Sequence, residues 1–465
     1  MKQKIGQKYE QLKTYLTSEV ISFALLKAIL LPIFWEQLFL ACLGLFSIWL
    51  LSFDGENAMS VVNMMAIIFK VFTSLCLGLV TGGTVLVAQN IGAKRKDEAG
   101  RCIVQAVSFS VVTTTVLSAF LLLIREPLTH YLLFGANQEI LTQAAIYFSG
   151  FCITFPLYAF FQSFAGAMRG WGRSGLAWRL TLTVNGAELI LTAVLLIGFR
   201  LGVYGVMLAM ALSRVLGAGY AILLMMQNRE EFGLKWRRYL TPDPAILKGL
   251  LWVAIPLALE QFFFNSGRAV AQKYIASYGA EHMAVNGVVN AVFDMFNLPQ
   301  ITLREGLVTV VGMCIGCGRY DLAKRYVYRF LRVIWKSLLW LMPITIPLSV
   351  LLVLSYRLPQ ASNLLIMWCV LLIYVAGPLL LGGSLSIPAG LRAGGDATFV
   401  ALVTLGCMWG VRVSFSWLFA SVFHLGVFGI NAAMVLDWGV RSLFFRARLR
   451  GERWYRHKLI AEDSK

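Results

Sequence analysis

Charged residues are scarce in this chain of 465 residues, because Asp, Glu, Lys and Arg together make up only 14%, against about 25% in an average soluble domain. Apolar residues account for 58%, and the mean hydropathy is +0.73. This composition excludes a water-soluble globule, a disordered chain, a disulfide scaffold and a collagen-like fibre. The longest polar interval, residues 227–248, is too short to fold alone. The function must therefore lie within or between apolar helices.

Residues and motifs that carry enzyme chemistry are also missing. The four histidines all lie in polar gaps or in the C-terminal tail: His130, His282, His424 and His457. No histidine cluster within the apolar runs can bind a metal or act as a base, so we do not expect an enzyme. The glycine-rich phosphate loop that would bind a nucleotide is absent. Cys314 and Cys317 form a single CxxC without a second pair for zinc. We predict free thiols, no metal site and no cofactor.

What the chain does contain is a series of long apolar runs. At about 20 residues per membrane-spanning helix, the sequence accommodates twelve spans with short loops. The polar gaps between them alternate between a basic set with 30 of the 41 Lys and Arg, and a second set with only Arg125, Arg200 and Arg357. This asymmetry assigns the basic gaps and both termini to the cytoplasm. The excess of 18 positive charges is thus explained by topology and anionic lipid, not by nucleic acid.

The predicted organisation follows from these spans. We expect a cytoplasmic leader at residues 1–23, a first six-helix lobe at 24–226, a cytoplasmic linker at 227–245, a second six-helix lobe at 246–446 and a basic cytoplasmic tail at 447–465. The fold class is an all-α membrane protein of twelve transmembrane helices. We predict a monomer in the bacterial inner membrane, whose partners are the lipid bilayer and small amphipathic molecules.

An internal repeat relates the two predicted lobes. At an offset of 224 residues the Pro, Glu and Gln at positions 32, 36 and 37 fall on the same residue types at 256, 260 and 261. Arg169 and Gly172 fall on Arg392 and Gly395 at an offset of 223. Six spans is an even number, so both copies enter the membrane in the same direction, and their pseudo-two-fold axis lies along the membrane normal. Transporters commonly use such parallel halves, with the substrate held between them.

Several motifs in both halves resemble one known family. Residues 80–99, 166–172, 391–396 and 408–412 resemble the recurring signatures of the multidrug and toxic compound extrusion (MATE) family, in its bacterial branch, over essentially the whole chain. The resemblance implies a V-shaped bundle of two six-helix lobes. It also implies export of amphipathic, often cationic, compounds in exchange for sodium ions or protons.

Two glutamates within the spans are the first candidate site residues. Glu36 and Glu260 are repeat equivalents, and each follows a proline by four residues. Proline bends a helix, and a carboxylate buried one turn beyond the bend is partly driven toward its protonated form. Such a group can exchange a proton or cation for a competing ligand. Phe263 and Phe264 follow Glu260 and offer aromatic faces to an organic cation. A structural carboxylate bonded to backbone freed at the bend is the alternative.

A second candidate site departs from the family pattern. Many members carry an Asp in the first span, but Ser47 stands there, and Ala271 stands at its repeat equivalent. In the fifth span Asn185 and Glu188 are three residues apart, which keeps both on one helical face and suits a cation site. Because of these departures the sequence leaves the coupling ion open between H⁺ and Na⁺.

Other intramembrane charges are candidates for structural pairs, because a lipid-facing charge at mid-helix costs about 2.5–3.5 kcal/mol. The repeat superimposes Lys70 on Asp294 and Glu188 on Arg412, and brings Arg214 within one position of the equivalent of Asp437. Opposite charges at equivalent positions can meet across the pseudo-axis or find partners within their own lobe, and both possibilities stay open. Arg412 resembles the buried Arg of the family and is interpreted as structural, with Glu188 as a possible counter-charge.

The alternative function within the same superfamily is a flippase for lipid-linked saccharides. Such a carrier needs a cationic cavity to hold a pyrophosphate, and Arg268, Lys273, Arg304 and Arg412 are the residues that would supply it. Arginines directed into a cavity, with Glu260 turned away from it, would favour this alternative. The leading prediction remains a secondary antiporter that works by alternating access of its two lobes.

Overall fold

The computed structural model describes residues 14–51, 56–132, 138–234, 239, 241–355, 359–455 and 459. Within these ranges the chain is helical and contains no β-strand. Twelve of its helices are long and apolar enough to cross a membrane. The predicted all-α fold class with twelve transmembrane helices is therefore confirmed.

The helices of the first half run in chain order as α2 (Phe23–Leu51), α3 (Glu56–Gly92), α4 (Lys96–Leu123), the short α5 (Arg125–Leu132), α6 (Gln138–Trp171), α7 (Ser174–Ala193) and α8 (Gly202–Gln227). The second half consists of α10 (Pro244–Ala276), α11 (Ala280–Gly316), α12 (Tyr320–Ser355), α13 (Gln360–Leu381), α14 (Ile387–Ala393), α15 (Ala397–Cys407), α16 (Ser414–Trp417) and α17 (Gly426–Arg450). Four π-helical turns interrupt the spans: η1 (Val194–Gly198), η2 (Gly382–Ser386), η3 (Met408–Val413) and η4 (Leu418–Val422).

Contacts divide the chain into two compact units. The N-unit comprises Leu31–Ala258, and the C-unit comprises Leu259–Lys465 together with Met1–Leu30. The boundaries fall inside α2 and α10, so each of these helices contributes residues to both units. The predicted lobe boundaries, at residues 226 and 246, lie instead at the polar gap between two apolar runs of the sequence.

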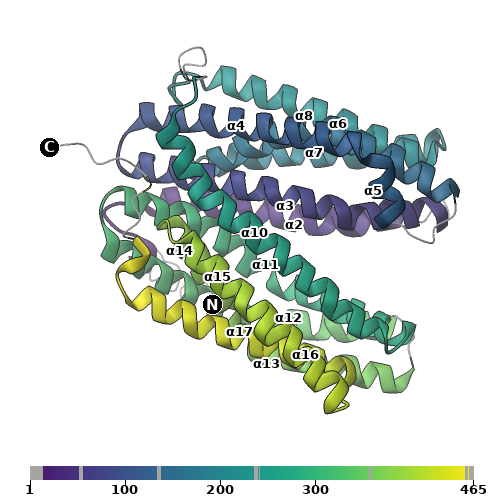
Figure 1. Ribbon diagram of the computed structural model, residues 1–465. Helices are drawn as coiled ribbons and strands as arrows, with labels where there is room; N and C mark the ends of the chain where they lie inside the picture. Colours follow the sequence, from purple (N-terminus) through teal and green to yellow (C-terminus); the bar gives the residue numbers. More distant parts are fainter. Residues whose placement is uncertain are drawn as a thin grey trace, which may run out of the picture. The chain divides into compact units, whose positions relative to one another are not determined.

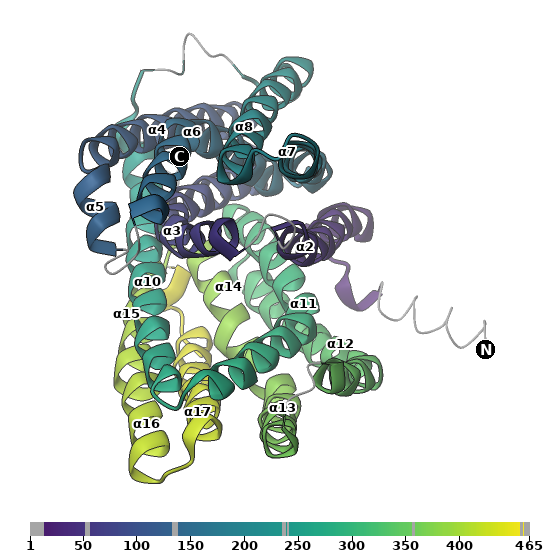
Figure 2. The ribbon, with the colours of Figure 1, turned by 90° about the vertical axis from the view of Figure 1, so that its right-hand side faces the viewer.

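The N-unit is built around α6, which packs against α3, α4, α7 and α8. Figures 1 and 2 both draw α4, α6 and α8 side by side. Aromatic side chains fill the core, and the Phe69 and Phe151 rings stack with centroids 3.9 Å apart. Gly166 and Gly170 let α6 approach α3 closely. A Cβ at Gly170 would lie 2.5 Å from the Thr84 carbonyl oxygen, and one at Gly166 would lie 2.5 Å from the Val80 side chain. This close packing fixes the end of α6.

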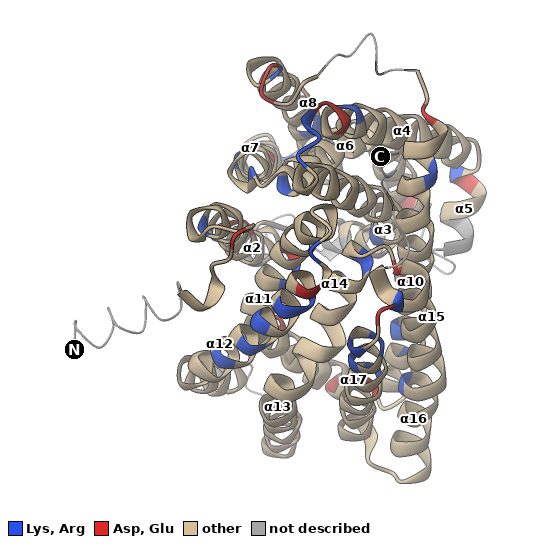
Figure 3. Ribbon diagram, turned by 90° about the vertical axis from the view of Figure 1, so that its left-hand side faces the viewer, with Lys and Arg blue, Asp and Glu red and all other residues tan. Residues whose placement is uncertain are grey.

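In the C-unit α11, the repeat counterpart of α3, packs against α12, α13 and α14, while α17 packs against α13. The rings of Phe296 and Tyr374 meet edge to face at 4.8 Å. The first half of α12 carries five basic residues (Figure 3): Lys324, Arg325, Arg329, Arg332 and Lys336.

The repeat is visible in the backbone as well as in the sequence. Positive φ angles occur at matching turns of the two halves: Lys94 (62°) and Gly318 (71°), Gly172 (88°) and Gly395 (93°), Arg200 (52°) and His424 (54°), Gly202 (56°) and Gly426 (53°). The π-helical turns η1 and η4 also coincide at an offset of 224. The same chain reversals and the same π turn thus recur in both copies.

The described parts of the predicted leader, linker and tail pack on the units to which they belong. Tyr326 Oη donates to the carbonyl oxygen of Leu16 at 2.8 Å, while residues 1–13 lie outside the described chain. In the linker, Gln105 Nε2 donates to the carbonyl oxygens of Tyr239 and Thr241 at 2.5 and 2.7 Å. Arg448, where the predicted tail begins, pairs with Asp396 at 2.6 Å.

Candidate functional site

Glu36 is the buried acid of the N-unit. It lies on α2 one turn beyond Pro32, and the residue is only 2% exposed. Its Oε1 accepts hydrogen bonds from the Arg169 guanidinium at 2.6 Å and from the Thr181 hydroxyl at 2.9 Å. Its Oε2 is buried and has no hydrogen-bond partner in the described chain. One carboxylate oxygen is therefore fully engaged and the other is available.

Three helices position these groups. Arg169 lies in the last turn of α6, and Gly172 at φ 88° turns the chain into α7. Thr181 lies on α7 and is buried. Because glycine adopts a left-handed conformation without the steric cost that a Cβ brings, the turn after Arg169 is well suited to it. The carboxylate of α2 thus ties together the end of α6 and the middle of α7.

Glu260 is the corresponding acid of the C-unit. It lies on α10 one turn beyond Pro256 and is 5% exposed. The Arg392 guanidinium, in the last turn of α14, donates to Oε1 at 2.6 Å and to Oε2 at 2.8 Å. In the part of the chain that the structure describes, Glu260 accepts hydrogen bonds from Arg392 alone. Both oxygens of Glu260 are therefore engaged.

The two ion pairs are repeat equivalents of each other, and the sequence analysis did not predict them. Arg169 and Arg392 are repeat equivalents in the sequence, as are Glu36 and Glu260, but the predicted charge pairs joined opposite charges at the same or adjacent positions of the repeat. A signal was present, because both members of each pair recur in both copies. The partners are 133 and 132 residues apart along the chain, so spacing could not reveal the contact.

Glu188, the other predicted acid of the N-unit, lies on α7 close to α8. Its charge interacts electrostatically with that of Arg214 on α8. Arg214 donates to Thr154 Oγ1 at 2.8 Å and lies 5.0 Å from the centre of the Phe151 ring. The structure thus gives Glu188 a counter-charge within its own unit.

Asn185 lies on α7 between Thr181 and Glu188. Its Nδ2 donates to the carbonyl oxygen of Thr181 at 2.8 Å. One of the two amide N–H groups is therefore used by the backbone one turn earlier, which leaves the other N–H and the side-chain oxygen for any ligand. The predicted cation site at Asn185 and Glu188 stays a prediction.

In the C-unit the predicted charges gather around the ring of Phe264. Asp437 and Arg441 form a buried ion pair one turn apart on α17. Arg412 on η3 interacts electrostatically with Asp437. The guanidiniums of Arg412 and Arg441 lie 6.0 and 5.4 Å from the centre of the Phe264 ring. Protein cations therefore already face the ring that was predicted to receive an organic cation.

The remaining predicted residues are Phe263, Lys70 and Asp294. Phe263 is half-buried and meets Phe262 edge to face at 5.4 Å. Lys70 of the N-unit and Asp294 of the C-unit are both exposed within their own units. The pairing of Lys70 with Asp294 stays a prediction.

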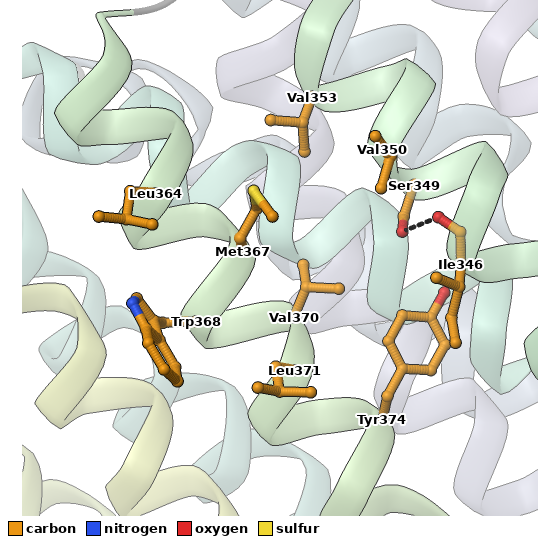
Figure 4. A pocket seen from close by; sticks show the side chains of 10 residues that line it. All are labelled: Ile346, Ser349, Val350, Val353, Leu364, Met367, Trp368, Val370, Leu371 and Tyr374. Carbon is orange, nitrogen blue, oxygen red and sulfur yellow. Dashed lines mark hydrogen bonds between the residues drawn. The ribbon is translucent and has the colours of Figure 1, made fainter.

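The C-unit contains an apolar cleft between α12 and α13 with a volume of about 330 Å³ (Figure 4). Aliphatic side chains, Met367 and Trp368 line most of it, and Ser349 and Tyr374 contribute hydroxyl groups. The Ser349 hydroxyl is taken by the carbonyl oxygen of Ile346 at 2.7 Å. Within the described part of the chain, none of the residues that line the cleft is charged.

A fold of twelve membrane-crossing helices, with a buried carboxylate–arginine pair in each copy of a duplicated unit, is that of a membrane transporter. The family model named MatE matches residues 32–195 and 256–418, which are the two copies of the repeat. The chain belongs to the multidrug and toxic compound extrusion family.

Curated relatives and solved structures agree with this assignment. The chain is 24% identical to an uncharacterized transporter, YisQ, of Bacillus subtilis, over 91% of this chain and 93% of the relative. It is 23% identical to the probable multidrug resistance protein NorM of Thermotoga maritima, over 98% of each chain. A MOP superfamily transporter from Pyrococcus furiosus superimposes with a TM-score of 0.84 at 17% identity, over 92% of this chain and 95% of the other.

Proposed function

We propose that the protein is a secondary active antiporter that exports amphipathic, cationic compounds in exchange for H⁺ or Na⁺ by alternating access of its two lobes. The observation that carries the proposal is the buried Glu36, whose Oε2 has no partner while Oε1 is held by Arg169 and Thr181. A buried carboxylate with a vacant oxygen is chemically suited to receive a proton or a small cation.

The ion pair supplies the coupling step. An ion at Oε2 competes with the positive charge of Arg169 for the same carboxylate, so loading weakens the contact between α2 and the end of α6. Unloading restores it. A ligand shifts a conformational equilibrium only by binding the two states differently. The Glu36 carboxylate binds the ion with different affinity in the two conformational states when Arg169 and Thr181 are close to it in one state and displaced in the other. No bond is made or broken in the transported compound.

The proposed orientation follows from the distribution of Lys and Arg. Both termini and the basic gaps face the cytoplasm of a bacterial cell, the protein acts as a monomer in the inner membrane, and nucleic acid is not a partner. Single cysteines introduced at exposed positions of the two sets of gaps, labelled in intact cells with a membrane-impermeant maleimide, test the sidedness. Labelling of the basic gaps from outside would contradict the orientation.

Reconstitution in liposomes tests the function. Efflux of a cationic dye is followed with a sodium gradient alone, a pH gradient alone and neither, for the wild type, Glu260→Gln and Glu188→Gln. We expect the wild type to follow one of the gradients, and we expect both variants to transport less. Dye movement that depends on neither gradient would exclude antiport. Normal transport by both variants would exclude these residues but not the mechanism.

A lipid-linked saccharide flippase is the second candidate, and one observation favours it. Arg268 and Arg412 line a polar cavity of the C-unit, and Glu260 is absent from the residues that line it. Arg304 instead pairs with its neighbour Glu305 at 3.0 Å, and Lys273 is exposed outside the cavity. Translocation of a fluorescent polyprenyl-pyrophosphate saccharide in the same liposomes, without dye efflux, would support the flippase over the antiporter.

A further inference from the structure

A small polar cavity lies in the C-unit where α10, α11, η3 and α17 meet. Its volume is about 40 Å³, and an enclosed space needs about 10–15 Å³ to hold one water molecule. The polar side chains that line it are two arginines and four carboxamides: Arg268, Arg412, Gln272, Asn286, Asn290 and Asn431. No carboxylate of the described chain lines it. The space suits a group of a few atoms that accepts hydrogen bonds.

The two arginines of this cavity have no protein acceptor in the described chain. Arg268 is exposed within the C-unit and makes no hydrogen bond or ion pair in the described chain, and Nε of Arg412 is buried without a partner. The Asp437 carboxylate interacts electrostatically with Arg412, but its Oδ2 is already paired with Arg441. Arg268 and Arg412 also repel each other electrostatically. Among the described groups, three guanidiniums, those of Arg268, Arg412 and Arg441, thus share the carboxylate of Asp437, and this excess of positive charge in a membrane-spanning region favours an anion.

The carboxamides add hydrogen-bonding groups of fixed orientation. Asn286 Nδ2 donates to Gln272 Oε1 at 3.1 Å, which leaves the Gln272 amide group as a donor. Asn431 Nδ2 is used by the carbonyl oxygen of Val427 at 3.0 Å. The other lining residues are apolar, among them Ala271. The cavity thus combines guanidinium and amide donors beside an apolar wall, as the recognition of an acidic headgroup on an apolar chain requires.

Local backbone structure places the two arginines together. Arg412 lies on the π-helical turn η3, a type of distortion that frequently occurs at functional sites. Gly267 precedes Arg268 on α10, and a Cβ there would lie 2.7 Å from Met408 at the start of η3. The absence of that Cβ lets η3 approach α10 closely enough for both guanidiniums to reach one cavity.

We infer that this cavity binds the acidic group, a carboxylate or a phosphate, of an amphipathic compound. Guanidinium groups match the planar and tetrahedral oxyanions through charge-assisted hydrogen bonds. Binding stands on the geometry of the cavity alone. Only the further step, that the bound compound is transported, rests on the proposed function. If that step holds, the transported compounds include ones that carry an acidic group in addition to any cationic one.

Calorimetric titration of the full chain in phosphatidylcholine nanodiscs tests the site. The probes are decanoate, decyl phosphate, decanol and decyltrimethylammonium, which share their alkyl chain length and differ in charge. We expect the two anions to bind and the alcohol and the cation not to bind at this site. Gln272→Glu is the sharpest variant, because it retains the acceptor for Asn286 and adds a negative charge. It should weaken decyl phosphate binding at least about tenfold, and Arg412→Gln should do the same.

Lys273→Gln is the matched control, because it removes one positive charge from the neighbouring position of α10 without touching the cavity, and it should bind as the wild type does. Unchanged decyl phosphate binding in Gln272→Glu, or in Arg412→Gln, would overturn the site. Nanodiscs containing phosphatidylglycerol distinguish the sources of the anion. Competition assigns the site to a lipid headgroup, and its absence assigns it to a free amphipath. Anion binding without any gradient-driven efflux would refute the proposed antiport while retaining the site.

Discussion

The two buried glutamates occupy equivalent places in the duplicated unit but differ in how they are held. Glu36 of the N-unit gives one oxygen to Arg169 and Thr181 and keeps the other without a partner. Glu260 of the C-unit gives both oxygens to Arg392. In both copies the glutamate lies one helical turn beyond a proline and pairs with an arginine. The duplication thus preserved the ion pair and changed how many oxygens it uses.

The difference separates two roles that one carboxylate–arginine pair can fill. A carboxylate held at both oxygens is a structural link, because any ion must first displace the arginine. A carboxylate with a vacant oxygen can receive an ion before its arginine leaves. We therefore expect coupling to depend more on the N-unit pair and stability to depend more on the C-unit pair.

The largest expected effect is on stability. Arg392→Met leaves Glu260 buried without its only described donor and should lower the free energy of unfolding by about 3–5 kcal/mol. Arg169→Met should cost less, because Thr181 still donates to Glu36. Urea unfolding in detergent measures both. Arg173→Met is the control, because its pair with Glu231 is exposed and should contribute about 0–1 kcal/mol. A larger loss for Arg169→Met than for Arg392→Met would reverse the comparison.

The next effect concerns transport. Glu36→Gln should reduce gradient-driven efflux about tenfold or more, the scale of a coupling free energy between sites. Glu260→Gln should reduce efflux less and lower the melting temperature more. Initial rates are measured in liposomes and corrected for the amount of folded protein inserted. Equal rates in the two variants would mean that the vacant oxygen of Glu36 has no special role.

A smaller effect isolates the additional hydrogen bond of the N-unit. Thr181→Val removes the second donor to Glu36 and should destabilise the protein by about 1 kcal/mol. Thr404 stands at the matching position of the C-unit, is buried, and is not among the donors to Glu260. Thr404→Val should therefore be close to neutral in the same unfolding measurement. A cost of equal size at both positions would show that the hydroxyls act on packing and not on the carboxylate.

The smallest effect tests what the two copies share. Gly172→Ala and Gly395→Ala place a Cβ at φ 88° and 93°, so each should cost about 1 kcal/mol. Gly175→Ala is the control, because nothing lies within 4 Å of the added Cβ and the residue is inside α7. Costs that differ widely between Gly172 and Gly395 would show that the turns after the two arginines are not equivalent.

Much of the fold could be predicted from the sequence. The twelve spans follow from long apolar runs, and the repeat follows from matches such as those of Glu36 and Glu260. These features are local or periodic. The contact of Glu36 with Arg169 is neither, because it depends on how closely α6 approaches α3 and on the turn at Gly172. The sequence signal for this contact was that both members of the ion pair, the glutamate and the arginine, recur in both copies of the repeat.

The charges of the C-unit show a second limit of prediction from the sequence. The sequence identified Arg412 and Asp437, but their surroundings depend on the π-helical turn η3 and on the missing Cβ of Gly267. A π turn shifts every following side chain around the helix, so a regular helical periodicity misplaces Arg412. The polar cavity that Arg268 and Arg412 line together could not be predicted for this reason.

The most direct test of the account compares two modes of transport in the same liposomes for Glu36→Gln. Counterflow exchange of labelled for unlabelled substrate needs no ion gradient, whereas net efflux against a substrate gradient does. We predict that Glu36→Gln retains counterflow and loses gradient-driven efflux. A variant that still follows the ion gradient at the wild-type rate would contradict the claim that this carboxylate couples the ion to export.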